Sequence, residues 1–276
     1  RQSTLARRCA PEPRQRTRVS GSPSEPDAPQ RQRPYSVRFE WGLDGARAVV
    51  PGADLAVVVD VLSFTTCVSV AVDRGAMVFP YPLRDVSASE FAAHHGASLA
   101  GPRDSVGLSL SPASLRGAPA LERVVLPSPN GSTISHDLAA SARQVVAVSL
   151  RNAAATADWV HSTLPADAVI AVVAAGEKWA GGGLRPALED ELGAGAFIAG
   201  LTAAGRGVLS PEATAAAAAF DAAEPRLAAV LRDCSSGREL IDAGFAEDVR
   251  IAAELDGSSV VALLKDGAFQ AKSFPN

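Results

Sequence analysis

Three acidic residues occupy positions that could support chemistry. Asp60 directly follows the apolar run LAVVV, and Glu189 and Asp190 begin the segment LEDELGAGAFI. An acid that ends a buried strand needs a partner or a metal ion, because an unpaired charge is costly to bury. Carboxylates without neighbouring Cys or His side chains favour a hard cation such as Mg²⁺. Glu189 and Asp190 also have a structural explanation, since acids in the first turn of a helix complement its dipole.

Small polar residues gather at the same kind of place, where an apolar run ends and a helical pattern begins. Helix N-termini that carry hydroxyl and backbone N–H donors bind phosphate-like anions. Together with the acids, these positions indicate metal-assisted chemistry on a phosphate ester. The residues are Thr65, Thr66, Asn130, Gly131, Arg151 and Asn152. Thr65 and Thr66 also have a structural explanation as N-caps, and Asn130-Gly131 has one as a turn.

The order of apolar runs and helical segments predicts the fold that must position these residues. Their alternation is typical of an α/β protein with a mainly parallel or mixed sheet and helices packed around it. Such a sheet places its active site at the C-terminal ends of the strands. Near the end of the sequence, SVVALLKDGAFQA predicts a hairpin with Asp266 and Gly267 in its turn. We expect an α/β domain over residues 35–276, as one body or as two subdomains.

Composition limits the class of protein further. The 276 residues are 47% hydrophobic, which is enough for a sizeable core. A net charge of -4 offers no basic field for nucleic acid, and no apolar run is as long as a transmembrane helix. Three cysteines without a CxxC pair are typical of reduced thiols in a cytoplasm. We expect a cytoplasmic protein with a small-molecule partner and no nucleic-acid or membrane partner, and a homo-oligomer is left open.

Residues 1–34 differ from the remainder of the chain. They contain eight Arg against three acids, together with six Pro. Such a segment buries too little apolar surface to fold, so we expect a disordered Arg/Pro-rich tail. An inert extension and a nucleic-acid-binding arm are the alternatives, and the arm predicts an affinity that depends steeply on salt.

Taken together, the junctions resemble the 2-phosphosulfolactate phosphatase family, a group of Mg²⁺-dependent phosphatases with an α/β fold of their own. The resemblance covers about Val49 to Leu264. It rests on five stretches that occur in the family's order, namely DVLSFTTCV, SPNGST, SLRNAAATA, LEDELGAGAFI and SSGRELIDAGFAEDVRIAAELD.

The resemblance implies an activity and a set of site residues. The activity is Mg²⁺-dependent hydrolysis of a small anionic phosphate monoester, either 2-phosphosulfolactate, as in coenzyme M biosynthesis, or a related phospho-hydroxy acid. The alternative is a relative that binds an anionic phosphometabolite without turnover. The implied metal and catalytic acids are Asp60, Glu189 and Asp190, and the implied substrate-binding residues are Thr65, Thr66, Asn130, Gly131, Asn152 and Ser235.

The chain departs from the family pattern at three positions. Ser63 stands where the pattern often has Arg, Cys67 stands in place of Thr, and Pro129 precedes the Asn-Gly pair. A loop Arg is the natural partner of a second anionic group on the substrate. We therefore consider Arg151 as its replacement, against the alternative of a solvated Arg at a strand end. Cys67 is either a packed thiol or a rival nucleophile, because thiolates are stabilised at helix starts.

Overall fold

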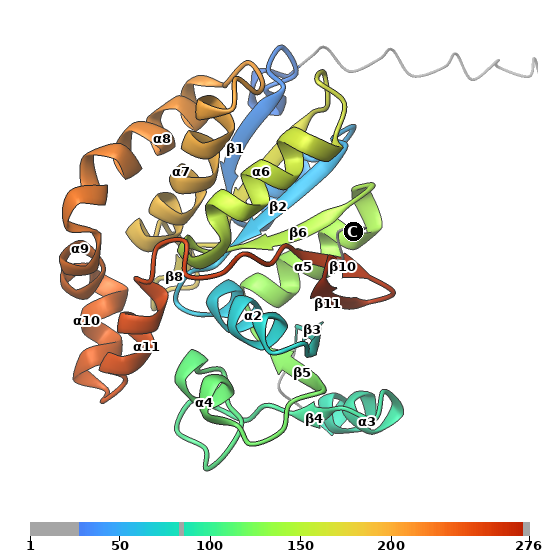
Figure 1. Cartoon of the computed structure of the whole chain (residues 1–276), viewed down its shortest axis with the longest axis vertical. Helices are drawn as coiled ribbons and strands as arrows, with labels where there is room; N and C mark the ends of the chain where they lie inside the picture. The colour runs from blue at the N-terminus through green and yellow to red at the C-terminus, as the bar shows by residue number, and fades with distance from the viewer. Residues whose placement is uncertain (1–27, 83–85, 273–276) are drawn as a thin grey trace, which may run out of the picture.

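The computed structural model of the chain describes residues 28–82 and 86–272. Helices cover both faces of a nine-stranded sheet, which confirms the predicted α/β class (Figure 1). In spatial order, the strands are β1 (Val37–Trp41), β7 (Ile170–Ala174), β2 (Leu55–Val59), β6 (Val145–Val148), β10 (Ala262–Lys265), β11 (Ala268–Ala271), β3 (Met77–Tyr81), β5 (Arg123–Pro127) and β4 (Ser98–Leu99). A separate antiparallel pair consists of β8 (Glu177–Lys178) and β9 (Leu184–Arg185).

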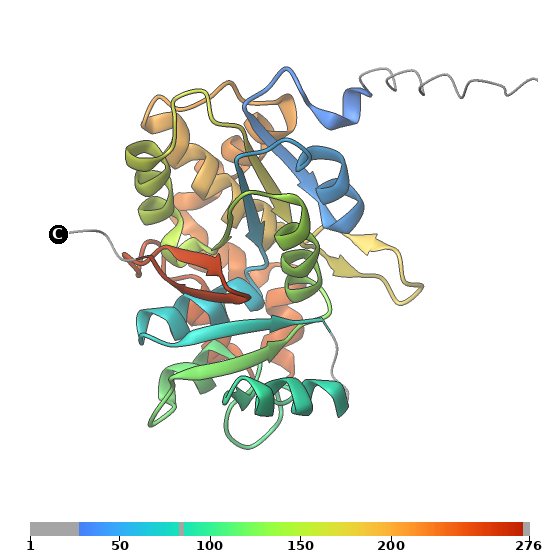
Figure 2. The same cartoon turned by 90° about the vertical axis from the view of Figure 1, so that its right-hand side faces the viewer.

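The large sheet consists of two parallel groups of strands joined by an antiparallel hairpin. One group is β1, β7, β2 and β6, and the other is β3, β5 and β4. Strand β10 pairs antiparallel with β6, and β11 pairs antiparallel with β3. Figure 2 shows the two groups lying at a steep angle to each other. The predicted hairpin turn is confirmed, because Asp266 and Gly267 both have positive φ, as a type I′ turn requires.

Two large hydrophobic cores hold most of the helices against the sheet, and a smaller cluster around Phe79 and Ala92 adds to them. Alternate residues of β2 point to opposite faces. Val57 and Val59 pack in the core that contains Trp159 of α6 and Phe197 of α7, whereas Val58 packs in the core of α1, α2 and α5. The helices are α1 (Gly42–Val49), α2 (Phe64–Asp73), α3 (Val86–His94), α4 (Pro112–Gly117), α5 (Gly131–Ser141), α6 (Ala153–Thr163), α7 (Leu188–Ala203), α8 (Pro211–Ala223), α9 (Leu227–Asp233), α10 (Ser235–Asp242) and α11 (Ala246–Ala252).

The segment before β1 differs in part from the predicted tail. Residues 1–27 lie outside the described residues, but Pro29–Arg31 form a 3-10 turn. The buried side chain of Gln32 donates to the carbonyl oxygen of Phe39 and accepts from its N–H. The predicted disordered tail therefore does not extend to residue 34, because this reciprocal pair fixes residues 29–32 beside β1. Within the described ranges, no helix is long and apolar enough to span a membrane.

Candidate active site

Asp60 lies at the C-terminal end of β2, and backbone donors fix both of its carboxylate oxygens. Oδ1 accepts a hydrogen bond from the Phe64 N–H at 3.1 Å, and Oδ2 accepts one from the Gly131 N–H at 2.9 Å. The first donor belongs to the start of α2 and the second to the start of α5. Burial nevertheless raises the pKa of Asp60 to about 6, although these two hydrogen bonds oppose the rise.

Gly131 has a steric reason to be glycine. A Cβ at this position would lie 2.4 Å from Cδ1 of Phe64 and 2.6 Å from Oδ2 of Asp60. Both contacts are shorter than real Cβ atoms show, so a larger residue would move α5 away from the carboxylate. The Asn-Gly pair therefore allows the start of α5 to approach Asp60 closely, and it is more than a turn.

Thr65 and Thr66 support the loop around Asp60. The Thr65 hydroxyl donates to the Asp60 carbonyl oxygen and accepts from the Asp60 N–H, and the Thr66 hydroxyl donates to the Val61 carbonyl oxygen at 2.7 Å. Both side chains are fully buried, and neither belongs to the lining of the cavity described below. In this structure the two threonines position the carboxylate and do not reach the space in front of it.

Asp190 also accepts hydrogen bonds from backbone N–H groups. Its two oxygens accept from the N–H groups of Val61 and Gly176, at 2.7 and 2.8 Å, so it ties the loops after β2 and β7 to the start of α7. Burial and then the charge of Asp60 raise the pKa of Asp190 well above its ordinary value. Glu189 is 2% exposed, and its Oε2 lies 3.5 Å from Sγ of Cys234.

Glu177 is a member of this acid group that the sequence patterns did not single out. It follows β7, and its Oε2 accepts from Nδ2 of Asn130 at 3.1 Å. Burial raises the pKa of Glu177 to about 7, with further contributions from the charges of Asp60 and Glu189. The Asn130–Gly131 pair thus holds Glu177 through its side chain and Asp60 through its backbone.

Asp60, Glu177 and Asn130 line one cavity of about 520 Å³. The cavity lies between the ends of β2 and β5, the loop that follows β4, and α10. Its other lining residues are Leu62, Ser63, Pro82, Arg103, Leu110, Ser128, Pro129, Ser236, Glu239 and Leu240. Within the described ranges, no Lys or Arg side chain is in salt-bridge contact with Asp60 or Glu177, whereas Glu239 pairs with Arg185 at 3.1 Å.

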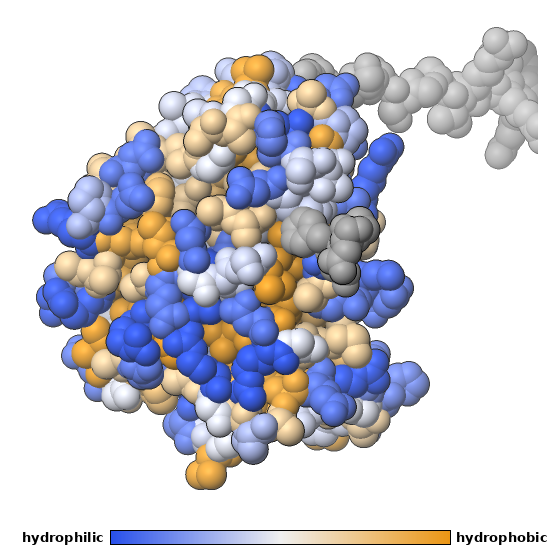
Figure 3. Space-filling view, viewed as in Figure 1, coloured by the Kyte–Doolittle hydropathy of each residue, from blue (hydrophilic) through white to orange (hydrophobic). Residues whose placement is uncertain are grey.

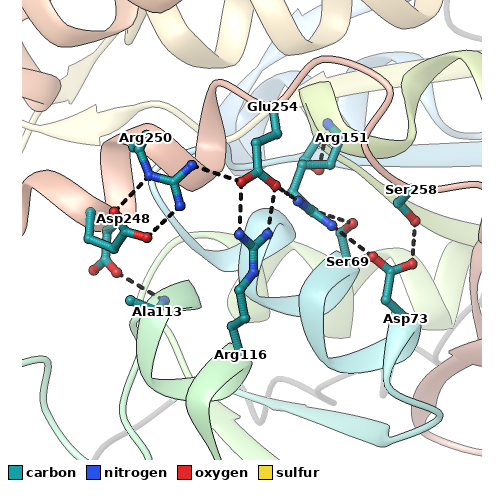
Figure 4. Close-up of polar contacts among 11 residues, drawn as sticks. Ser69, Asp73, Ala113, Arg116, Arg151, Asp248, Arg250, Glu254 and Ser258 are labelled. Carbon is teal, nitrogen blue, oxygen red and sulfur yellow. Dashed lines mark hydrogen bonds and ion pairs between the residues drawn. The ribbon is translucent and has the colours of Figure 1, made fainter.

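Arg151 and Asn152, which the sequence predicted to bind substrate, do not line this cavity. Arg151 is 4% exposed and forms ion pairs with Asp73 and Glu254 (Figure 4). The Asn152 side chain accepts from the Ser149 N–H and donates to the Ala147 carbonyl oxygen, so it stabilises the turn after β6.

Two further candidates also lie apart from the cavity lining. Ser235 is exposed, and its neighbour Ser236 is the serine of α10 that lines the cavity. Cys67 is fully buried in the core, and burial raises its pKa well above the ordinary value for a thiol. A protonated, enclosed thiol is a poor nucleophile, so Cys67 is a packed core residue.

Asp60 and Glu177 could bind Mg²⁺ only together with ligands from substrate and water. In the part of the chain that the structure describes, no group of three or more His, Cys, Asp or Glu side chains is arranged to hold a metal ion. Asp190 does not line the cavity, and its two oxygens bind the N–H groups of Val61 and Gly176 away from it. Asp60 and Glu177, however, present oxygen atoms to one cavity, and Mg²⁺ commonly binds to one or two carboxylates together with substrate phosphate and water.

Comparison with known families agrees with this geometry. Residues 47–267 match the family described as 2-phosphosulpholactate phosphatase. The chain belongs to this family. The match includes the ends of β2, β5 and β7, which carry Asp60, Asn130 and Glu177, and it includes Arg103 and α10. A comparison with curated proteins gave no match. The family assignment made from the sequence is therefore confirmed.

Proposed function

We propose that this protein is a Mg²⁺-dependent phosphatase that hydrolyses a small anionic phosphate monoester, 2-phosphosulfolactate or a related phospho-hydroxy acid. The observation that supports this most is that a buried carboxylate, Asp60, and a half-buried one, Glu177, line one cavity with no Lys or Arg in salt-bridge contact among the described residues. Their raised pKa values reflect a cost of negative charge that a bound cation would offset. Family membership supports the reaction class.

Asp60 and Glu177 are the residues that would hold Mg²⁺. When bound, the cation would neutralise phosphoryl oxygens and orient a water molecule for attack. Backbone N–H groups fix Asp60, and the Asn130 amide fixes Glu177, so both carboxylates are oriented before substrate arrives. Glu189 would add negative charge behind them, and Asp190 would keep the loops after β2 and β7 in place.

The cavity also fits the size and polarity of such a substrate. Ser128 and Ser236 line it with hydroxyl groups that can donate hydrogen bonds to phosphate oxygens. Leu62, Leu110 and Leu240 form the apolar part of its wall and limit the access of water. Phosphoryl transfer depends mainly on positioning and on stabilisation of charge, and this lining could supply both.

The test is an assay of phosphate release from a panel of monoesters with Mg²⁺ and with EDTA. We expect turnover that EDTA abolishes and that Asp60→Asn lowers by about a thousandfold, because loss of a metal-holding carboxylate costs several kcal/mol of transition-state stabilisation. Asp221→Asn, a substitution of an exposed acid on α8, is the matched control and should leave the rate unchanged.

Two outcomes would contradict the proposal. Turnover that persists in EDTA would remove the metal role of Asp60 and Glu177. A protein that is stabilised against heat by sulfolactate or phosphate, but that releases no phosphate from any ester, would instead be a non-catalytic binding relative, because ligand binding raises thermal stability whether or not turnover follows.

A further inference from the structure

The cavity has a basic side as well as an acidic one. Arg103, from the loop between β4 and α4, is the one basic residue among the described residues that line it. Its side chain is 17% exposed. Arg103 and Asp60 line the same cavity, and the ion pair of Arg103 is with Asp248 and not with Asp60.

Three contacts hold the Arg103 guanidinium on the cavity wall. Nη1 donates to Oδ2 of Asp248, Nη2 donates to Oγ of Ser63 at 2.9 Å, and the Phe245 ring lies 5.5 Å from the guanidinium carbon. These contacts come from the start of α2 and from α11 and the residue that precedes it. An arginine has five N–H donors, so the two hydrogen bonds leave others able to bind an incoming anion.

Asp248, the acid that pairs with Arg103, is itself held by other donors. Its Oδ1 also accepts from the Ser111 hydroxyl at 2.6 Å and from the Ala113 N–H at 3.1 Å, the second of which Figure 4 shows. With a side chain only 1% exposed, Asp248 is a fixed anchor. Two hydrogen bonds therefore fix the orientation of the Arg103 guanidinium, and its remaining N–H groups can bind an anion.

Ser236 provides an independent indication of a ligand on this cavity. The residue is 5% exposed and lines the cavity, yet its Oγ has no hydrogen-bond partner within the described ranges. A buried hydroxyl without a partner is costly, and a ligand oxygen at this place would satisfy it.

We propose that Arg103, together with Ser236, forms a subsite for a second anionic group of the substrate, a carboxylate or a sulfonate carried by the alcohol part of the phosphate ester. This inference rests on the proposed phosphatase function. Ser63, at the start of α2, accepts a hydrogen bond from Arg103, so the guanidinium is held against the loop that also carries Asp60.

The opposed charges would also orient the substrate. The phosphate goes to the side of Asp60 and Glu177, where the cation would be held, and the second anion goes to Arg103, away from the carboxylates. A phosphate ester with a neutral alcohol part lacks the second anchor and should bind in several orientations.

The experiment compares two esters that differ in one group, 2-phosphoglycolate and 2-hydroxyethyl phosphate. We expect Arg103→Gln to raise KM for 2-phosphoglycolate at least tenfold, while kcat/KM for 2-hydroxyethyl phosphate stays within twofold. Arg103→Lys, which keeps the charge but loses the planar fork, should give an intermediate KM. Arg238→Gln is the control, because Arg238 has a side chain 67% exposed on α10 and should change neither substrate. Circular dichroism establishes that each variant is folded, and Arg103→Lys decides the result if Arg103→Gln is not.

A second measurement separates failure of the subsite from failure of the proposed function. Calorimetric titration with 3-sulfolactate, which has no phosphate, reports binding without turnover. A tenfold weaker Kd in Arg103→Gln, but not in Arg238→Gln, would support the subsite even if no ester is hydrolysed. Equal losses on both esters, losses on neither, or an unchanged Kd for 3-sulfolactate would overturn it.

Discussion

Two groups of acidic residues in this protein differ in whether arginine side chains pair with them. The acid group at the cavity contains Asp60 and Glu177 without basic partners in salt-bridge contact within the described ranges, and burial raises the pKa of Glu177 to about 7. The ion-pair network, which we define as Asp73, Arg116, Arg151 and Glu254, pairs every charge (Figure 4). There, hydrogen bonds from Arg116 lower the pKa of Glu254.

The difference separates a group that stabilises the fold from one that costs stability. In the ion-pair network, Arg116 binds both oxygens of Glu254, at 2.8 and 2.6 Å, and Arg151 joins Glu254 to Asp73. The network ties α2 and α4 to the chain after α11, and Figure 3 shows hydrophilic side chains gathered on this face. Asp60 and Glu177 accept hydrogen bonds from backbone N–H groups and from Asn130, but within the described ranges no Lys or Arg forms a salt bridge with them. Carboxylates whose pKa is raised in this way are typical of a functional site.

The largest expected effect in this comparison is on stability and follows from Arg151→Ala. The substitution leaves Asp73 and Glu254 with a partly buried charge and one partner fewer, so the free energy of unfolding should fall by about 3 kcal/mol. Urea denaturation measures this change. Arg238→Ala on the surface is the control and should cost less than about 1 kcal/mol.

The same variant tests the earlier expectation that Arg151 binds substrate. Once corrected for the folded fraction, Arg151→Ala should have an unchanged KM for 2-phosphoglycolate. A variant of normal stability whose KM rises tenfold would return Arg151 to the substrate site and remove the distinction between the two groups.

A smaller effect of opposite sign is expected for Glu177→Gln. The amide retains an acceptor for Asn130 but carries no charge, so the free energy of unfolding at pH 8 should rise by about 1 kcal/mol without Mg²⁺, a figure reduced for partial exposure. Phosphatase activity should fall in the same variant. Glu122→Gln, which changes an exposed acid, should alter neither quantity. A loss of stability in Glu177→Gln would mean that the charge already has a partner.

The smallest expected effect is the change of stability with pH. Because the folded-state pKa values of Asp60 and Glu177 lie above their ordinary values of 3.8 and 4.5, the native state binds more protons than the unfolded state between about pH 4 and 7. In EDTA, stability from these two groups should therefore fall as the pH rises from 5 to 8. Mg²⁺ should raise the melting temperature more at pH 8 than at pH 5.5, since protons compete with the cation. An equal shift at both pH values would contradict this linkage.

Much of the fold was predictable because local patterns determine it. The buried run LAVVV forms β2, and the Asp266-Gly267 pair forms the hairpin turn between β10 and β11. The way in which the strands join was not predictable. The hairpin separates two parallel groups, and that arrangement depends on contacts between distant segments that no local pattern records.

The residues of the candidate site were predictable only where a local sequence pattern marks them. Asp60 and the Asn130-Gly131 pair stand at strand ends and were found from their position. Glu177 also follows an apolar run, AVIAVVAAG, and the rule that identified Asp60 could have identified it. Arg103 lies in a loop without periodicity, and its anchor Asp248 is 145 positions away in the sequence, so only the structure brings it to the cavity.

The hairpin of β10 and β11 has a consequence for the order of events during synthesis. Ala262 and Leu263 pair with β6, and Phe269 pairs with Val78 of β3, so the last described strands to leave the ribosome join the two halves of the sheet. The hydrogen-bonded sheet is therefore complete only after β11 has been translated, and pairing across such long sequence separations is intrinsically slow.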